Sequence, residues 1–363
     1  MCIGDRLGDE LGSELAIMKG RVDGLEARVN GIEAGSFSDT TTMGGTAGFL
    51  IGATDSASDA NDKVMMEYFY EVDLNTSFTG EDKLNIEIET GNHPGIGVGA
   101  DKVGLDWGSD NGDTLKVSDV NYTFPLGGWT VAVGDSMDAS KTWPNACAVN
   151  NMVDNLGDCG AANSVDLSGD VSLSASTEFG DGWELGLGIS ADSGETSRGI
   201  FTNEGDDYYG IAIGYERDTF GFTAAYSMKE STTIANSTTG WVQSDNASQK
   251  DTTYYGLVGY YSPESTPLTL SGGIELSDIE GTNTDKTQWT VGVSTDLGEG
   301  TLSATFGTNG AIADNAEEIY AYDLSYEYPI NDSMSVTPFV YVAETTGSTV
   351  DTTGAGAFVS FSF

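Results

Sequence analysis

The most constraining feature of this chain is a regular alternation of apolar and polar residues, which recurs in segment after segment from Thr46 onward. In stretches such as LNIEIE (84–89), apolar residues stand at every second position, and Asn or Glu stands between them. Successive side chains of a β-strand point to opposite faces, so each stretch predicts a strand with one apolar and one polar face. We predict sixteen strands, with approximate spans 44–54, 63–78, 82–90, 113–124, 129–135, 169–179, 182–192, 206–217, 220–229, 251–262, 266–277, 285–296, 300–308, 318–328, 333–344 and 354–363.

The connections between these segments alternate in length. TGED, PLGG, FGDG, RDTF, SPEST, LGEG and PIND are tight turns rich in Gly, Pro, Asp or Asn, and each alternates with a longer loop. Short turns at one end and long loops at the other, with an even strand number, are typical of outer-membrane barrels. A soluble β-sandwich would alternate in polarity but not so regularly in loop length. We therefore predict an all-β membrane protein, a 16-stranded antiparallel outer-membrane β-barrel over residues 37–363.

Other features of the sequence agree with a barrel. No run of 18 apolar residues occurs, so a transmembrane helix is not expected. The last segment, GAGAFVSFSF, alternates and ends in Phe361 and Phe363, which resembles the signal read by the barrel-assembly machinery of bacterial outer membranes. Aromatic residues near strand ends fit girdles at the two membrane interfaces; they are Tyr68, Trp129, Trp183, Tyr215, Phe220, Trp289 and Tyr328.

The charge is strongly one-sided. Net charge is -43, from 57 acidic and 14 basic residues, so nucleic acid is not an expected partner. Carboxylates on the lumen face of a barrel raise the local cation concentration and lower that of anions, which predicts cation preference. The residues predicted to line the pore are Glu71, Asp73, Glu87, Glu89, Asp119, Glu275, Asp323 and Glu327.

The third long loop, 135–169, is the longest. The loop order resembles that of general porins, whose third loop folds into the barrel and narrows it. The alternatives are an external loop over the rim, or a constriction made by loop 90–113. In 135–169, Cys147 and Cys159 suit a disulfide formed in an oxidising compartment, with two free thiols as the alternative. The charged candidates at the constriction are Asp135, Asp138, Lys141, Asp154 and Asp158.

No catalytic constellation, metal site or cofactor site is predicted. His93 is the only histidine, and its HPG context suggests a turn. The Glu87 and Glu89 pair lies on one strand face, as expected of any polar lumen. The glycines at 95, 97 and 99 lack the strand–helix context of a dinucleotide site. We therefore expect a protein that is not an enzyme.

The N-terminal residues follow a different period. Apolar residues from Leu11 to Ile32 are spaced alternately by four and three, which is a heptad seam. RVDGLE and RVNGIE repeat one heptad apart, and this Arg-apolar-x-x-apolar-Glu pattern resembles that of three-stranded coiled coils. We predict a parallel trimeric coiled coil over residues 1–36; the alternative is an amphipathic helix packed on the barrel. The trimerisation residues are Leu15, Met18, Arg21, Val22, Leu25, Glu26, Arg28, Val29, Ile32 and Glu33.

The junction RVDGLEARVNGIEA, followed by FSDTTTMGGTAGFLIG, resembles the cyanobacterial outer-membrane porin family. That resemblance implies a signal peptide, a periplasmic S-layer-homology domain, a coiled coil and then a barrel. Neither of the first two is present in this sequence, so we expect a mature, truncated or re-started chain, with peptidoglycan attachment only through the missing domain. The family is also described as carbohydrate-selective-porin-like or as iron-uptake porin.

Together these features predict a homotrimer in the lipid of the outer membrane, with its coiled coil in the periplasm. The favoured function is a porin for passive diffusion of small hydrophilic solutes and inorganic ions. One alternative is a channel selective for iron or sugars. A third is a structural envelope tether or trimeric adhesin, which sixteen strands in one chain disfavour.

Overall fold

The fold is known from a computed structural model, which describes residues 40–56, 63–92, 105, 111–148, 150–192, 194–196, 199–202, 206–230, 251–280 and 285–363. The predicted coiled coil (1–36) and His93 lie outside these residues. The strands are β1 (Thr41–Asp55), β2 (Met65–Thr76), β3 (Lys83–Gly91), β4 (Lys116–Leu126), β5 (Trp129–Asp135), β6 (Val171–Phe179), β7 (Trp183–Asp192), β8 (Asp206–Arg217), β9 (Phe220–Lys229), β10 (Thr252–Tyr261), β11 (Leu268–Ile279), β12 (Lys286–Leu297), β13 (Gly300–Thr308), β14 (Ile312–Ala313), β15 (Tyr320–Asn331), β16 (Met334–Ala343) and β17 (Thr352–Ser362).

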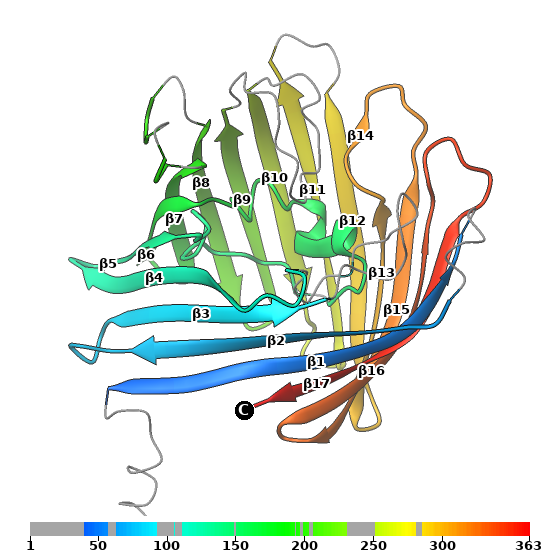
Figure 1. The fold of residues 1–363 in the computed structure, drawn as a ribbon. Helices are drawn as coiled ribbons and strands as arrows, with labels where there is room; N and C mark the ends of the chain where they lie inside the picture. The colour runs from blue at the N-terminus through cyan, green and yellow to red at the C-terminus, as the bar shows by residue number, and fades with distance from the viewer. Residues whose placement is uncertain are drawn as a thin grey trace, which may run out of the picture.

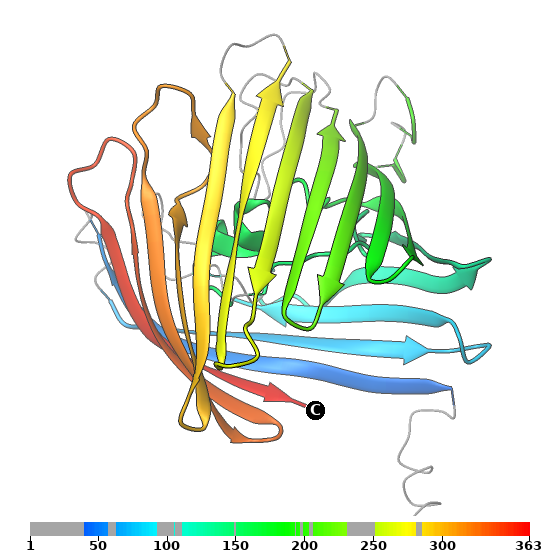
Figure 2. The same ribbon diagram turned by 180° about the vertical axis from the view of Figure 1, so that it is seen from behind.

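The strands form one closed antiparallel sheet (Figures 1 and 2). Each long strand pairs with its neighbours in the chain, and β1 pairs with β17 from Thr46 opposite Ser362 to Asp55 opposite Thr353. The two-residue strand β14 only extends the edge of β12 beyond the end of β13. Sixteen long strands therefore close the barrel, which confirms the predicted 16-stranded antiparallel β-barrel.

The alternation of connections is also as predicted. Short turns join β2 to β3, β4 to β5, β6 to β7, β8 to β9, β10 to β11, β12 to β13 and β15 to β16, and longer segments make the other connections. The β2–β3 turn shows how its sequence fixes it: Asp82 accepts hydrogen bonds from the backbone N–H groups of Phe78 and Thr79 and from the Ser77 hydroxyl. The Tyr122 hydroxyl also donates a hydrogen bond to Asp82 and has the largest effect on its pKa. Together these bonds lower the pKa of Asp82 well below its usual range.

The two faces of the sheet differ in chemistry. Outward positions carry exposed apolar side chains such as Ile51, Leu257 and Val291, each about half exposed. Inward positions carry Ser174, Thr223 and similar small polar residues that are almost fully buried. An apolar outer band with a polar interior is the pattern of a barrel whose surroundings are apolar. In the part of the chain that the structure describes, no helix is long and apolar enough to cross a membrane.

Aromatic side chains gather towards both ends of the barrel. At the short-turn end, the ring of Trp183 lies 4.9 Å from that of Tyr215 and 5.8 Å from that of Phe222, centroid to centroid. At the other end, Trp289 and Phe306 have their centroids 5.3 Å apart. Such rings suit the boundary between an apolar layer and water.

The last residue of the chain takes part in closing the barrel. Gly45 and Phe363 exchange two backbone hydrogen bonds of 3.1 Å each. The Phe363 ring stacks on Tyr70 with centroids 6.1 Å apart, and Phe361 meets Phe49 edge to face at 6.2 Å. The C-terminal aromatic residues therefore stabilise the joint between the first and last strands from outside.

Candidate functional site: the lumen and its inserted loop

The connection between β5 and β6 lies inside the barrel (Figure 1). Met137, Ala139, Val153 and Leu167, spread along this connection, are all fully buried. Its short 3-10 helix η2 (Asp154–Gly160) packs on the inner faces of β11, β12 and β13. Of the two positions that the sequence allows, inside the lumen or over the rim, the structure therefore has the first.

A row of glycines receives the first part of this loop. Trp143 lies against Gly186, Gly188 and Gly210, which face inward on β7 and β8. A Cβ atom at Gly210 would stand 2.3 Å from the Trp143 ring, and one at Gly186 would stand 2.6 Å from it. Glycine is therefore required here by close approach. These glycines are present in the sequence, but they can be interpreted as a contact surface for the loop only when the structure shows which strands lie side by side.

Glu275 on β11 binds the second part of the loop. Its carboxylate accepts hydrogen bonds from Ser164 N (2.7 Å) and Oγ (2.6 Å), and from Asn163 N and Nδ2 (3.0 Å each). A buried carboxylate is tolerated when donors surround it, and Glu275 is only 2% exposed. Glu275 faces inward as expected, but the loop covers it, so it does not line open pore.

Asp323 on β15 binds the tip of the loop in the same way. Its Oδ2 atom accepts hydrogen bonds from the backbone N–H groups of Met152 (2.8 Å) and Val153 (3.0 Å). On β12, Gln288 donates to the Asn155 carbonyl at 2.8 Å. Two residues expected to line the pore, Glu275 and Asp323, are thus anchors for the loop, because backbone N–H groups need buried acceptors.

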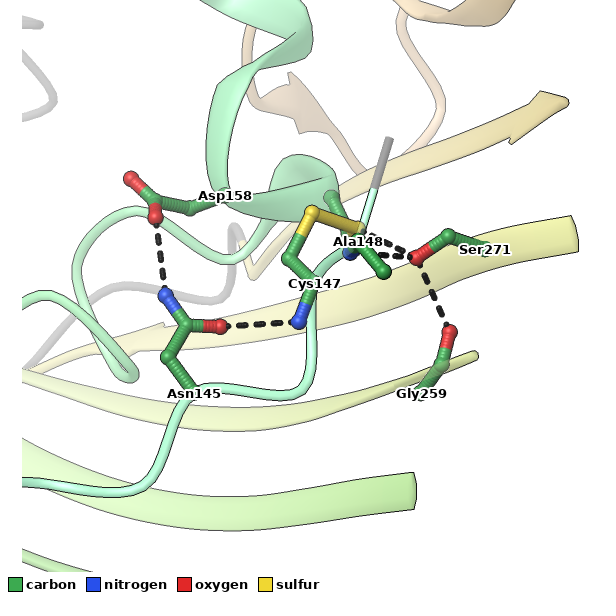
Figure 3. The surroundings of a disulfide bond; sticks show 7 residues. Asn145, Cys147, Ala148, Asp158, Gly259 and Ser271 are labelled. Carbon is green, nitrogen blue, oxygen red and sulfur yellow. Dashed lines mark hydrogen bonds between the residues drawn. A yellow bond between two sulfur atoms is a disulfide. The ribbon is translucent and has the colours of Figure 1, made fainter. Parts of the chain in front are cut away.

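The two loop cysteines form a disulfide (Figure 3). The Cα atoms of Cys147 and Cys159 are 5.6 Å apart. Beside the bond, the Ser271 hydroxyl on β11 accepts from Ala148 N (3.0 Å), lies 3.2 Å from the Cys159 sulfur and donates to the Gly259 carbonyl (3.1 Å). The disulfide therefore closes the loop on itself, and Ser271 fastens the closed loop to β10 and β11.

The acidic side chains of β2, β3 and β4 form a patch on the inner face of the barrel, which the loop meets through Lys141. We call this set the acidic wall: Glu71, Asp73, Glu87, Glu89 and Asp119. In the strand register, Asp73 stands opposite Glu87, and Glu87 stands opposite Asp119. Glu71 stands opposite Glu89 one step along the strands. Like charges directly opposite one another repel, so this patch attracts counter-charge.

Amide and hydroxyl groups orient the acidic wall. Asn85 donates to Asp73 Oδ1 (2.6 Å), Asn121 donates to Asp119 Oδ2 (2.9 Å) and Ser118 donates to Glu87 Oε1 (2.7 Å). Two lysines approach its edges: the Nζ atoms of Lys116 and Lys141 lie 2.8 Å from Glu89 Oε1 and 3.2 Å from Asp119 Oδ2, respectively. Five carboxylates and two ammonium groups leave the patch negative.

The loop carries carboxylates of its own. Confinement inside the barrel and the nearby Asp166 raise the pKa of Asp138 to about 7, although its side chain still meets solvent. Burial and Asp166 likewise raise the pKa of Asp158 to about 6. Asp154 begins η2 and is exposed. Asp135, the fifth charged candidate, ends β5 opposite the outward-facing Val120 and so lies on the outer face.

A hydroxyl-lined wall lies elsewhere around the lumen. Thr301 and Ser303 on β13, Ser325 on β15 and Thr337 on β16 face a cavity of about 400 Å³, together with Asn150 and Asn151 of the loop. Glu327, the remaining residue expected to line the pore, lies among these hydroxyl groups. The lumen therefore has an acidic wall, a hydroxyl-lined wall and an inserted loop that is anchored on β7, β8, β11 and β15.

Comparisons with known proteins agree with this architecture. Residues 215–363 match the family model of Gram-negative porins. An uncharacterized protein of Nostoc sp. is 27% identical over 391 aligned residues, which span 92% of this chain and 67% of that protein.

Three solved structures share the fold. The anion-selective porin from Comamonas acidovorans has a TM-score of 0.59 at 12% identity, over 89% of this chain and 99% of that one. OmpT, an outer membrane protein of Vibrio cholerae in a trimer form, has a TM-score of 0.59 at 11% identity, over 90% and 100%. A mutant of the Rh. blastica porin has a TM-score of 0.52 at 14% identity, over 89% and 100%. These structures show that the chain shares the barrel fold of porins, and the family model matches its C-terminal part, residues 215–363.

Proposed function

We propose that this protein is an outer-membrane porin through which small hydrophilic solutes and inorganic ions diffuse passively, with preference for cations. The observation that carries the proposal is the acidic wall inside a closed barrel, with an inserted loop whose charged side chains, apart from Lys141, are carboxylates. An enclosed passage lined by one sign of charge concentrates ions of the opposite sign.

The outer surface supports a location in a membrane. Ile51, Leu257, Val291 and many other outward side chains would expose a continuous apolar surface to water. Soluble monomers rarely expose apolar patches larger than a few hundred Å². The porin matches then favour the bacterial outer membrane.

We assign the constriction to the loop over 135–169. It is bound to the wall through Trp143, Glu275, Ser271 and Asp323. Contacts with β7, β8, β11 and β15 make it a fixed part of the lumen, and the passage then runs between the loop and the acidic wall. Loop 90–113, the rival for this role, contributes Leu105, which bridges to Val153 of the inserted loop.

Assembly is part of the same proposal. A homotrimer agrees with the trimer form of the structurally similar OmpT of Vibrio cholerae and with the heptad seam of residues 1–36. The coiled coil would then lie in the periplasm, because an even number of strands brings both ends of a barrel to one side. Recognition by the barrel-assembly machinery would use Phe361 and Phe363, and peptidoglycan attachment would need a further domain.

Single-channel recording in planar bilayers tests the proposal. The folded protein, added to a membrane between symmetrical KCl solutions, should give discrete and lasting conductance steps. A protein that inserts and keeps its folded electrophoretic mobility but gives no steps would contradict an open pore. The same recording can test the size of the pore. Because part of the wall is lined by hydroxyl groups, neutral polymers should enter it and reduce the current, up to a sharp limit in polymer size.

A further inference from the structure

Lys141 lies where the inserted loop approaches the acidic wall. Its Nζ atom donates a hydrogen bond of 3.2 Å to Asp119 Oδ2, and about a third of its side chain remains exposed. The same ammonium group interacts electrostatically with Glu71 on β2 and with Asp138 on the loop. One positive charge is therefore shared by carboxylates of the wall and of the loop.

Lys141 is the only Lys or Arg between residues 135 and 170. Other inward-facing ammonium groups have different surroundings. Lys116 pairs with Glu89 at the edge of the acidic wall. Lys229, on β9, is bound to Asn163 and Ser168 and lies over the ring of Tyr208. Among the described residues, Lys141 is thus the one basic residue of the loop that contacts the acidic wall.

The backbone around Lys141 is held independently of its charge. Lys141 N donates to the Asp138 carbonyl (3.1 Å), and Thr142 N and Oγ1 lie 3.1 and 2.9 Å from Ser174 Oγ on β6. The next residue, Trp143, occupies the glycine row. A change of the Lys141 side chain therefore alters the charge at the passage without releasing the loop.

We propose that Lys141 is a built-in counter-ion that determines how the channel discriminates between monovalent and divalent cations. The inference rests on the proposed cation-preferring porin. A passage conducts only when ions bind weakly enough to leave. Without Lys141, the five carboxylates and Lys116 would leave a more negative patch, which attracts a divalent ion about twice as strongly as a monovalent one in electrostatic energy. The tethered ammonium reduces this attraction and cannot diffuse away, so K⁺ continues to pass when Mg²⁺ is present.

The expected ligand is a hydrated divalent cation. Mg²⁺ gives up its water reluctantly, so it would lodge near the acidic wall through its bound water. This agrees with the finding that, in the described part of the chain, no three acidic side chains converge closely enough to chelate a metal ion. Direct coordination is therefore not part of the proposal.

The test compares wild type with K141Q, K141R and K83Q in planar bilayers. Lys83 is exposed at the start of β3 and supplies the same charge change away from the loop. With KCl on both sides, MgCl2 is titrated and the K⁺ current is measured. K141Q should lower the half-blocking Mg²⁺ concentration by roughly fivefold or more, as expected from one unit charge a few ångströms away in water. K141R and K83Q should behave as wild type.

The outcomes separate the two proposals. If wild type is cation-selective and K141Q shows unchanged Mg²⁺ block, the counter-ion role of Lys141 is wrong while the porin proposal stands. If K141R changes the block as much as K141Q, the effect comes from displacing the loop, which also overturns the role. If wild type shows no cation preference, the proposed function itself fails. Heat-modified mobility on gels verifies that each variant forms the barrel.

Discussion

Ser164 and Glu275 are 111 residues apart in the chain, yet the Ser164 backbone N–H and hydroxyl donate to one oxygen of the Glu275 carboxylate at 2.7 and 2.6 Å. Asn163 donates two more hydrogen bonds to the same group. A strand of the wall therefore holds the inserted loop through a charged group that water scarcely reaches. This contact anchors the loop in the lumen.

Replacing Glu275 with Gln should loosen the loop. Gln keeps the shape but removes the charge and adds an N–H₂ group that faces other donors, so we expect a loss of about 1–3 kcal/mol in loop docking. Single-channel recordings of E275Q should show larger open-channel noise and additional conductance levels. E327Q, in the hydroxyl-lined wall, is the matched control and should remain quiet. An equally quiet E275Q would show that Glu275 is not an anchor.

The disulfide should stabilise the closed part of the loop. Cys147 and Cys159 enclose a short segment, and a chain-entropy argument gives about 2–3 kcal/mol for a loop of this size. Double replacement by Ser should let the tip near Met152 leave Asp323 more often. Protease digestion of folded protein measures this: cleavage within 148–158 should be faster in the double variant or after reduction. Equal cleavage rates would mean that Ser271 and Asp323 suffice to hold the tip.

The contact between Gly210 and Trp143 should be sensitive to a single methyl group. G210A places a Cβ atom 2.3 Å from the Trp143 ring, so the loop must shift, at a cost of about 1–3 kcal/mol. In G210A/W143A the clash with the Trp143 ring disappears, and the nearest remaining contact, Leu167 Cδ2 at 2.9 Å, has to give. The double variant should therefore be less disturbed than the sum of the single variants predicts. The change in open-channel conductance gives the readout for all three. Additive changes would contradict direct packing of this pair.

Cation selectivity should rise with pH between about 5 and 8. The carboxyl groups of Asp138 and Asp158 have pKa values raised to about 7 and about 6, so they are largely neutral at pH 5 and gain charge as pH rises. These pKa values lie above those of an unfolded chain, so ionisation of the two carboxyl groups also weakens loop docking. Their contribution to docking stability is complete below about pH 4 and is lost as pH rises through 6 to 7. D138N should flatten the pH dependence of the reversal potential. An unchanged profile in D138N would exclude Asp138 as its source.

The acidic wall should dominate the selectivity. Neutralising Glu87, the central member of the row with Asp73 and Asp119, should reduce the permeability ratio of K⁺ to Cl⁻ by roughly two- to fivefold, the effect of one charge close to the passage. E87Q retains a partner for the Ser118 hydroxyl, so the local structure should persist. E327Q gives the comparison for a carboxylate that lies apart from this row.

The strands could be predicted from sequence because their signals are local. Polarity with a period of two and turns such as PLGG and FGDG identify each hairpin without knowledge of its neighbours, and four of the strands begin and end at the predicted residues: 129–135, 206–217, 220–229 and 300–308. The inward face of each strand follows from the same alternation.

The path of the inserted loop could not be predicted in the same way. An inward carboxylate such as Glu275 or Asp323 has the same sequence pattern whether it faces open water or binds backbone N–H groups. The seat of Trp143 is made by glycines on β7 and β8, which only the strand register brings together. Asp135 falls on the outer face because it is the last residue of β5 and stands opposite the outward-facing Val120. The coiled coil over 1–36 stays a prediction.

The reversal potential of the wild-type channel tests the central claim most directly. With a tenfold KCl gradient across a planar bilayer at pH 8, the acidic wall and the loop carboxylates should make the current reverse at a potential close to that of a K⁺-selective membrane, and E87Q should move it towards zero. A reversal potential near zero, or one of the sign given by Cl⁻ selectivity, would contradict a cation-preferring pore.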